Sequence, residues 1–431
     1  MRTEPTTLET ASQPCTIGIE NYHVWKAIRL ANSIIDAIVV PSVGGRILQL
    51  RLGDEEYLYV NPRHLGRVFG ANENHSAAGW KNYGGSKVWP APQGWSSDSE
   101  WPGPPDPILD GGNYAWEITD SGPNRAALLL TSPPDEYTGL TLQREISICP
   151  DSATLRIRHV MSNTSLRPVR WALWQVTQQI AGPHFAVFAP ARVYRQILGD
   201  QPFPSVTVSS GGVLRLDHKD RVAKFAVQVE EGWISSLDSC RSLVLVERFG
   251  IFREASYVDD APVAVWVNGP GTYTIHGDRL RTEDDPNGCD PYVETEVLSP
   301  LVQLQPGEEY SFEISWHCSR VRATAVERVN SCSVVSRDLS VAREASSLRV
   351  AASFGVFQAG SIELVSTGRD GRVAAVQPLG PVTPLAPCVL EATVPAAEDL
   401  FRLSLRARNR SGALLGTIAS AVVSASPPDP S

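Results

Sequence analysis

Short runs of residues that alternate between apolar and polar recur along most of this chain, and this rhythm limits the folds open to it. In the run 46–52, three leucines share one face, and Ile47, Gln49 and Arg51 share the other, as in a half-buried strand. Similar runs with turn residues at their borders continue to His317, at a spacing of roughly 8–12 residues that is typical of sandwiches and barrels. No window sustains an apolar stripe with helical spacing. We therefore expect an all-β protein.

A change in composition near residues 322–337 divides the chain into two expected domains. Residues 15–322 are rich in aromatic side chains. They are too many for one immunoglobulin-sized unit of about 100 residues, so we expect a large antiparallel two-sheet sandwich there. Residues 323–425 alternate cleanly with few aromatic residues, which predicts a small β-sandwich. Residues 1–14 and 426–431 are expected to be a disordered leader and a disordered tail.

The run 140–148 predicts a charge inside a sheet. Leu142, Arg144, Ile146 and Ile148 fall on one face of this expected strand, because strand side chains alternate with a period of two. Since the other members of that face are aliphatic, we expect Arg144 to lie in the sheet interior.

The stretch Gly79–Trp116 contains nearly half of the eleven tryptophans, several prolines and two Gly-Gly pairs. Frequent Pro and Gly exclude a helix, and a loop of this length is costly to order unless it folds over something. Aromatic rings among Asn, Lys, Gln and Asp suit a flat, hydroxyl-rich ligand, since rings cover C–H faces and polar groups bond hydroxyls. The alternative is a flap that only closes one end of the β-structure.

Charge and composition narrow the classes of partner and compartment. The net charge of −9, without any cluster of Lys or Arg, argues against a nucleic-acid partner. No apolar segment reaches the length of about 18 residues that a membrane helix needs. The N-terminus has neither the basic start nor the apolar core of a secretory signal, so we expect a cytoplasmic protein without a membrane partner.

Metal and cofactor sites have no support in the sequence. The seven cysteines lie far apart, and neither they nor the eight histidines show a metal-ligand spacing. The cysteines are interpreted as scattered thiols in a reducing compartment. No phosphate-binding loop, dinucleotide fingerprint or hydrolase nucleophile motif is present. We therefore expect no metal and no cofactor, which leaves acid/base work by carboxylates, His or Tyr near the aromatic stretch.

Several motifs occur in an order that resembles the galactose mutarotase-like (aldose 1-epimerase-like) superfamily. They are a Pro-x-x-Gly-Gly-Arg strand start at 41–46, a Gly-Gly turn within 82–89, an Asn-led turn into a strand at 163–178, and a Glu-rich strand with a Pro-Gly-Glu turn within 294–316. The chain is most similar to an uncharacterised bacterial branch with a GG-[DS]-[RK]-x-W core. The resemblance covers roughly residues 16–318. It implies a β-supersandwich with a sugar-binding cleft on its concave sheet.

The resemblance also implies a chemistry, which this chain matches only in part. Mutarotases open and close a sugar ring by general acid/base catalysis, usually with a Glu base and a His acid. Where the family places a His before Gly-Gly, this chain has Tyr83. Where the family has a catalytic His on the strand after the Asn turn, it offers Trp174, Thr177 and Gln178. A tyrosine with an ordinary pKa of about 10 is a weaker acid than His at neutral pH.

These observations define a set of candidate site residues. The catalytic candidates are Glu296, Tyr83 and His75. The substrate-binding candidates are Arg46, Asn82, Lys87, Trp89, Trp174, Gln178 and Glu294. Each has a plainer interpretation: exposed edge-strand charges for the two glutamates, a structural arginine beside the Gly-Gly turn, a solvated loop histidine, and core packing for Trp174.

The sequence thus predicts a protein that binds a small or oligomeric carbohydrate and can act on it by acid/base chemistry, as an epimerase does. The alternatives are a non-catalytic sugar-binding or structural β-sandwich protein, or a glycoside hydrolase or lyase on the same scaffold. The missing histidines favour binding alone, whereas Arg46, Lys87 and Glu296 favour an enzyme. The C-terminal sandwich is interpreted as an accessory binding or packing module, and because its sequence has no aromatic platform, packing is favoured.

Overall fold

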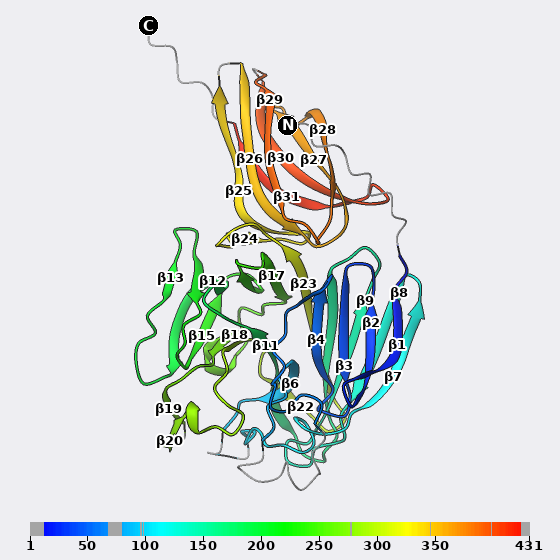
Figure 1. Cartoon of the computed structure of the whole chain (residues 1–431), viewed down its shortest axis with the longest axis vertical. Coiled ribbons are helices and arrows are strands. Elements are labelled where there is room, and N and C mark those ends of the chain that lie inside the picture. The colour runs from blue at the N-terminus through cyan, green and yellow to red at the C-terminus, as the bar shows by residue number, and fades with distance from the viewer. Residues whose placement is uncertain are drawn as a thin grey trace.

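The computed structural model describes residues 13–67, 80–94, 97, 99–275, 278–344, 346–397 and 399–423. Its described residues form β-strands, turns and two single helical turns, η2 (Val258–Asp260) and η3 (Thr282–Asp284). The prediction of an all-β protein is confirmed. The described part of the chain contains no helix with the length and apolar character needed to span a bilayer. Two β units follow one another along the chain, the larger one first (Figure 1).

One sheet of the larger unit, the cleft sheet, holds the site described below. Its neighbouring strands pair antiparallel. In spatial order they are β1 (Thr16–Tyr22), β2 (Trp25–Ala31), β3 (Ile35–Val40), β4 (Arg46–Leu52), β6 (Ser86–Ala91), β11 (Val169–Ile180), β21 (Tyr292–Leu298), β18 (Val263–Val267), β15 (Ala223–Val229) and the second half of β12 (Phe185–Leu198). Short strands β5 (Glu55–Glu56) and β22 (Val302–Leu304) pair with β4 and β11.

The second sheet of the larger unit, the outer sheet, is also antiparallel. In spatial order its strands are β7 (Ala115–Gly122), β8 (Arg125–Thr131), β9 (Leu140–Ile148), β10 (Thr154–Asn163), β23 (Glu309–Arg320), β17 (Leu243–Phe249), β16 (Trp233–Asp238), the first half of β12, β14 (Val213–Asp217) and β13 (Val206–Val208). Strand β12 therefore passes from one sheet to the other. A separate hairpin joins β19 (Thr272–Ile275) to β20 (Asp278–Arg281).

A single apolar core lies between the two sheets. Alternate residues of the facing strands supply it, such as Leu155 and Ile157 of β10 and Val293 and Val297 of β21, all buried. Burial of apolar area at about 25 cal/mol per Å² is the main favourable term for such an interface. Arg144 of β9 is completely buried there, so the prediction of a charge in the sheet interior is confirmed.

Arg144 joins the outer sheet to the cleft sheet. Its guanidinium donates hydrogen bonds to the carbonyl oxygens of Gly45 and Ser86, at 3.0 Å each. Both acceptors lie at the ends of cleft-sheet strands, next to glycine pairs. Burial lowers the pKa of Arg144 to about 9, which is the cost of removing this charge from water.

The smaller unit consists of two antiparallel four-stranded sheets around a second apolar core. One sheet contains β24 (Arg328–Val329), β25 (Ser333–Glu344), β26 (Ser347–Val356) and β29 (Cys388–Pro395), and the other contains β28 (Val373–Val382), β27 (Gly360–Gly368), β30 (Leu400–Asn409) and β31 (Leu414–Val422).

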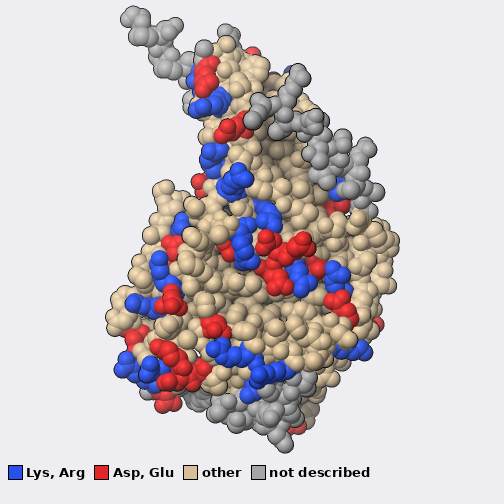
Figure 2. Space-filling model, viewed as in Figure 1, with Lys and Arg blue, Asp and Glu red and all other residues tan. Residues whose placement is uncertain are grey.

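The junction between the two units is both apolar and charged. Phe357 and Val334 of the smaller unit share a buried cluster with Trp233 and Val246 of the larger one. Acidic and basic side chains are mixed on the face in Figure 2, without a large patch of one sign. Ion pairs such as Arg320–Glu55 lie close to this junction.

Candidate functional site

The face of the cleft sheet that points away from the apolar core bears a cavity of about 480 Å³. This volume lies within the range of about 300–1,000 Å³ typical of small-molecule sites. Its aromatic wall consists of Trp80, Trp89, Trp174, Trp266, Tyr273 and Tyr292. Its charged lining residues are Lys224, Asp259, Asp285, Glu294 and Glu296.

Strand register explains why these side chains meet. Trp89 of β6 pairs with Trp174 of β11, and Gln178 of the same strand pairs with Glu294 of β21. Residues two apart on a strand share a face, so Tyr292, Glu294 and Glu296 all line the cavity. The expectation that the two glutamates share one face is confirmed.

Glu296 is a buried carboxylate with one oxygen still open. Its Oε2 accepts a hydrogen bond from the Trp174 indole at 2.8 Å and pairs with the Lys224 ammonium at 2.9 Å. Its Oε1 has no hydrogen-bond partner among the described residues. Complete burial raises the pKa of Glu296, while Lys224 opposes that rise. A buried acceptor without a donor is costly, and this one belongs to a residue that lines the cavity.

Glu294 anchors a second charge pair beneath the aromatic wall. Its Oε1 accepts a hydrogen bond from Gln178 at 2.6 Å and lies 3.7 Å from the Lys87 ammonium. Lys87 is almost completely buried, and its ammonium lies 4.3 Å and 5.6 Å from the ring centroids of Trp89 and Trp80. Burial lowers the pKa of Lys87 to about 8. Lys87 and Gln178 therefore contact the wall of the cavity from behind and do not line it.

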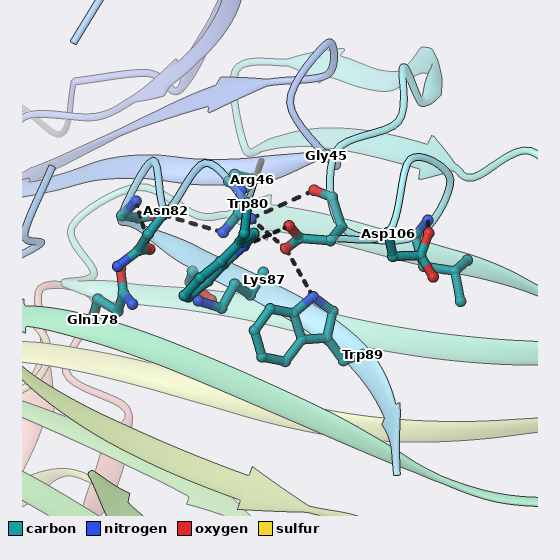
Figure 3. Close-up of polar contacts among 12 residues, drawn as sticks. Gly45, Arg46, Trp80, Asn82, Lys87, Trp89, Asp106 and Gln178 are labelled. Atoms are coloured by element: carbon teal, nitrogen blue, oxygen red, sulfur yellow. Dashed lines mark hydrogen bonds and ion pairs between the residues drawn. The ribbon is translucent and has the colours of Figure 1, made fainter. Parts of the chain in front are cut away.

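Asp110, at the end of the tryptophan-rich stretch, holds that stretch against the cleft sheet. Its carboxylate accepts hydrogen bonds from the indoles of Trp80 and Trp89 and pairs with Arg46, and Figure 3 shows these two rings on either side of Lys87. Gly44 has φ +74, and a Cβ there would lie 1.9 Å from the Asp110 carbonyl oxygen. Only glycine permits so close an approach in this conformation.

The remaining predicted residues lie farther from the cavity. Arg46 is completely buried in its pair with Asp110. Asn82 donates a hydrogen bond to the hydroxyl of the lining residue Tyr292 at 3.3 Å. Tyr83 packs in an apolar cluster with Trp25, where the ring centroids are 5.9 Å apart, and it does not line the cavity. His75 lies outside the described residues.

A second buried carboxylate, Glu247 of β17, lies on the opposite face of β11 and β21, the two strands that form the floor of the cavity. It accepts hydrogen bonds from Gln175 at 2.8 Å, from Trp316 at 3.0 Å, from Thr177 at 3.3 Å and from Thr295. Gln175 and Thr177 lie on β11 and Thr295 on β21, the strands that carry the cavity residues on their other face. Burial raises the pKa of Glu247 to about 7. This residue ties the floor of the cavity to the outer sheet.

Sequence reasoning missed several of these residues. Tyr292 could have been found, because it precedes Glu294 by two positions and so shares its face. Lys224 gave no signal, since it resembles an ordinary strand lysine in the run 223–229. Glu247 closes an apolar run and resembles an exposed strand end. Asp110 lies in an irregular loop, where no periodic pattern marks it.

The arrangement defines a class of site: a half-enclosed aromatic cavity whose wall contains carboxylates, one of them with an open acceptor. Within the described ranges, no group of three or more His, Cys, Asp or Glu side chains is placed to hold a metal ion. Among the described lining residues, the Glu296 carboxylate is able to accept a hydrogen bond or a proton.

A family model described as "Domain of unknown function (DUF4380)" matches residues 25–319, and the chain belongs to this family. A comparison with curated proteins found no match.

Solved structures with a similar arrangement include two galactose mutarotase-like proteins. The one from Clostridium acetobutylicum is 12% identical, with a TM-score of 0.43 over 71% of this chain and 99% of that chain. The one from Lactobacillus casei is 12% identical, with a TM-score of 0.44 over 68% and 99%. A TPR-domain containing protein from Parabacteroides distasonis is 15% identical, with a TM-score of 0.44 over 71% of this chain and only 53% of that chain.

Proposed function

We propose that this protein binds a carbohydrate in the cavity of the cleft sheet. The observation that carries the proposal is the buried Glu296 carboxylate, whose Oε1 has no partner among the described residues and belongs to a lining side chain of an aromatic cavity. A sugar hydroxyl supplies the missing donor, and the C–H faces of the ring suit the aromatic wall. The sequence resemblance to the galactose mutarotase-like superfamily, and to its branch with the GG-[DS]-[RK]-x-W core, agrees with this proposal.

Two further features support a binding site rather than a plug of tryptophans. The indoles of Trp80 and Trp89 are held by Asp110, and that of Trp174 is held by Glu296. These rings are therefore fixed in place around an open volume of about 480 Å³. Fixed rings lower the entropic cost of binding a ligand.

Titration of the full chain with a panel of neutral mono- and disaccharides tests the proposal. Isothermal calorimetry and ligand-observed NMR should detect binding of at least one of them. The variant Glu296→Gln should weaken it about tenfold or more, because the open acceptor loses its charge. Glu391→Gln, at an exposed position of β29, is the matched control and should bind like the original chain. Absence of binding across the panel would contradict the proposal.

A second candidate is acid/base catalysis on the bound sugar, as in an epimerase. It is favoured by the direct contact of Glu296 with Lys224 in the cavity wall, which places a proton acceptor beside a proton donor. Exchange NMR on the anomers of each bound aldose should then show faster interconversion, which Glu296→Gln abolishes. Binding without any rate enhancement would leave a sugar-binding protein.

Incubation of the full chain with neutral oligosaccharides tests the hydrolase alternative, and incubation with uronate-containing oligosaccharides tests the lyase alternative. Those activities cleave a glycosidic bond, so they would release a new reducing end from a disaccharide or oligosaccharide. Two carboxylates flanking the bond are the usual requirement for hydrolysis, and Glu294 and Glu296 are two of the four carboxylates that line this cavity. Unchanged oligosaccharides after prolonged incubation would exclude these alternatives.

A further inference from the structure

We propose that the ligand of this cavity is an uncharged sugar, and that the cavity discriminates against sugars that carry a phosphate or a carboxylate. This inference rests on the proposed carbohydrate-binding function and names the chemical class of its ligand. It follows from where the charges lie, which of them already have partners, and which hydrogen-bonding role the wall leaves open.

The lining is acidic. Asp259, Asp285, Glu294 and Glu296 line the cavity, and Lys224 is its one lining cation among the described residues. Proteins usually recognise phosphate with Arg or Lys forks, or with free backbone N–H groups at a helix N-terminus. The helical turn beside this cavity, η2, itself carries Asp259 and Asp260. Asp259, Glu294 and Glu296 are paired with Arg195, Lys87 and Lys224. An anionic ligand would therefore meet no unpaired lining cation among the described residues.

The ammonium group of Lys224 already has an ion-pair partner and an aromatic contact within the protein. Its ammonium lies 2.9 Å from Glu296 Oε2 and 4.6 Å from the centroid of the Trp174 ring. A ligand anion could use this lysine only by competing with a buried carboxylate. That exchange would leave Glu296 as an uncompensated buried charge, which is strongly unfavourable.

The other nearby cations are sealed behind the wall. Lys87 lies beneath the rings of Trp80 and Trp89 with about 1% of its side chain exposed. Arg46 is completely buried and pairs with Asp110. Neither can reach a ligand without displacement of the tryptophans.

The arginines near the rim are also paired with acidic side chains. Arg195 contacts Asp259, Arg279 contacts Asp200, and Arg63 contacts Asp290. The parts of the chain between residues 68 and 277 that lie outside the described residues contain no Lys or Arg. The sequence therefore has no additional cation of these types to offer there.

The hydrogen-bonding atoms that lack partners at this site also favour an uncharged sugar as the ligand. Among the lining residues, Glu296 Oε1 is a buried acceptor without a hydrogen-bond partner among the described residues; behind the wall, Gln178 Oε1 and Lys87 Nζ also lack one, but neither residue lines the cavity. A hydroxyl can donate to an acceptor of this kind. Ionised phosphate and carboxylate groups only accept, so the donor must be a sugar hydroxyl and the anionic group itself finds no partner in this acceptor.

The test begins with the neutral sugar that binds best in the panel. The full chain is titrated at pH 7.5 with this sugar, with its 6-phosphate and with its uronate. We expect both anions to bind at least about tenfold more weakly, as charge repulsion at short range in a partly buried site predicts. The difference should shrink as salt is raised, because screening weakens repulsion between charges. A purely steric exclusion would not respond to salt.

Variants test the electrostatic origin of the discrimination. Glu294→Gln removes one wall charge and leaves the Lys87 ammonium beneath it, so the affinity ratio of neutral to anionic sugar should fall several-fold. Asp285→Asn provides the same test at a half-buried position. Glu391→Gln should leave the ratio unchanged, and thermal unfolding checks that each variant is folded.

The outcomes separate this inference from the proposed function. If an anionic sugar binds as tightly as its neutral parent or more tightly, the inference is overturned and carbohydrate binding stands. Binding of an anionic sugar without binding of any neutral sugar overturns the inference in the same way. If no sugar of either kind binds, both fall together.

Discussion

Two buried carboxylates lie on opposite sides of the same pair of strands, and their surroundings differ. Glu247, on the core side, accepts four hydrogen bonds from neutral donors and has no ion pair among the described residues. Glu296, on the cavity side, has Lys224 and Trp174 on one oxygen and no described hydrogen-bond donor on the other. Glu247 is saturated with hydrogen bonds within the fold, whereas one oxygen of Glu296 is not. Under the proposed function, this difference separates a structural carboxylate from a binding one better than burial does, because both are completely buried.

The largest expected effect comes from removing the saturated carboxylate. Glu247→Leu leaves up to four buried donors without an acceptor and should lower the free energy of unfolding by about 3–5 kcal/mol. Urea denaturation followed by tryptophan fluorescence measures this loss. Glu247→Gln keeps one acceptor oxygen and should cost clearly less. Equal stability of the Leu variant and the original chain would show that Glu247 does not hold the two sheets together.

The next effect is a pH dependence with a defined sign. Burial raises the pKa of Glu247 from 4.5 to about 7, so between these values the folded chain holds a proton that the unfolded chain has lost. Stability from this group is therefore complete below pH 4.5 and declines by about 3 kcal/mol as pH rises through 7. The decline should appear as a difference between the original chain and Glu247→Gln in unfolding measured from pH 4.5 to 8. Parallel curves would contradict it.

A smaller effect of the opposite sign is expected at the buried lysine behind the cavity. Burial lowers the pKa of Lys87 to about 8, so the folded chain sheds a proton that the unfolded chain keeps up to about pH 10.5. Its contribution rises with pH between these values. Lys87→Met leaves Glu294 without its ion-pair partner and with only the hydrogen bond from Gln178, so it should lower the free energy of unfolding at pH 7 by about 1–2 kcal/mol.

Unfolding of the Lys87→Met variant should also lose the gain in stability between pH 8 and 10.5. Lys26→Met, at an exposed position of β2, is the control and should keep that gain. A higher free energy of unfolding for Lys87→Met than for the original chain at pH 7 would show that the desolvation of Lys87 costs more than its pair with Glu294 contributes.

The smallest expected effect on stability comes from replacing Glu296, the carboxylate with one oxygen that lacks a described hydrogen-bond partner. Glu296→Gln keeps the shape of the side chain and an acceptor for Trp174, but it removes the partner of the mostly buried Lys224, so the free energy of unfolding should fall by about 1 kcal/mol. The same change should weaken sugar binding about tenfold, as proposed above. A large loss of stability without loss of binding would reverse the roles assigned to Glu296 and Glu247.

Much of the fold could be predicted from the sequence because strand alternation is a local property. The period of two placed Arg144 inside a sheet and put Glu294 and Glu296 on one face, and both expectations are confirmed. Local patterns also marked the tryptophan-rich stretch, which contributes Trp80 and Trp89 to the cavity wall. They could not show that Tyr83, beside the Gly-Gly turn, packs against Trp25.

The sequence by itself determined which faces of the strands are polar and where the aromatic rings are concentrated. Only the tertiary structure decided which charges are neutralised and which remain available. Lys224 and Glu296 are distant in sequence but lie 2.9 Å apart, and Glu247 meets its donors from three other strands. The energy of a buried charge depends on the partners that surround it. Those partners come together only when the two sheets pack against each other.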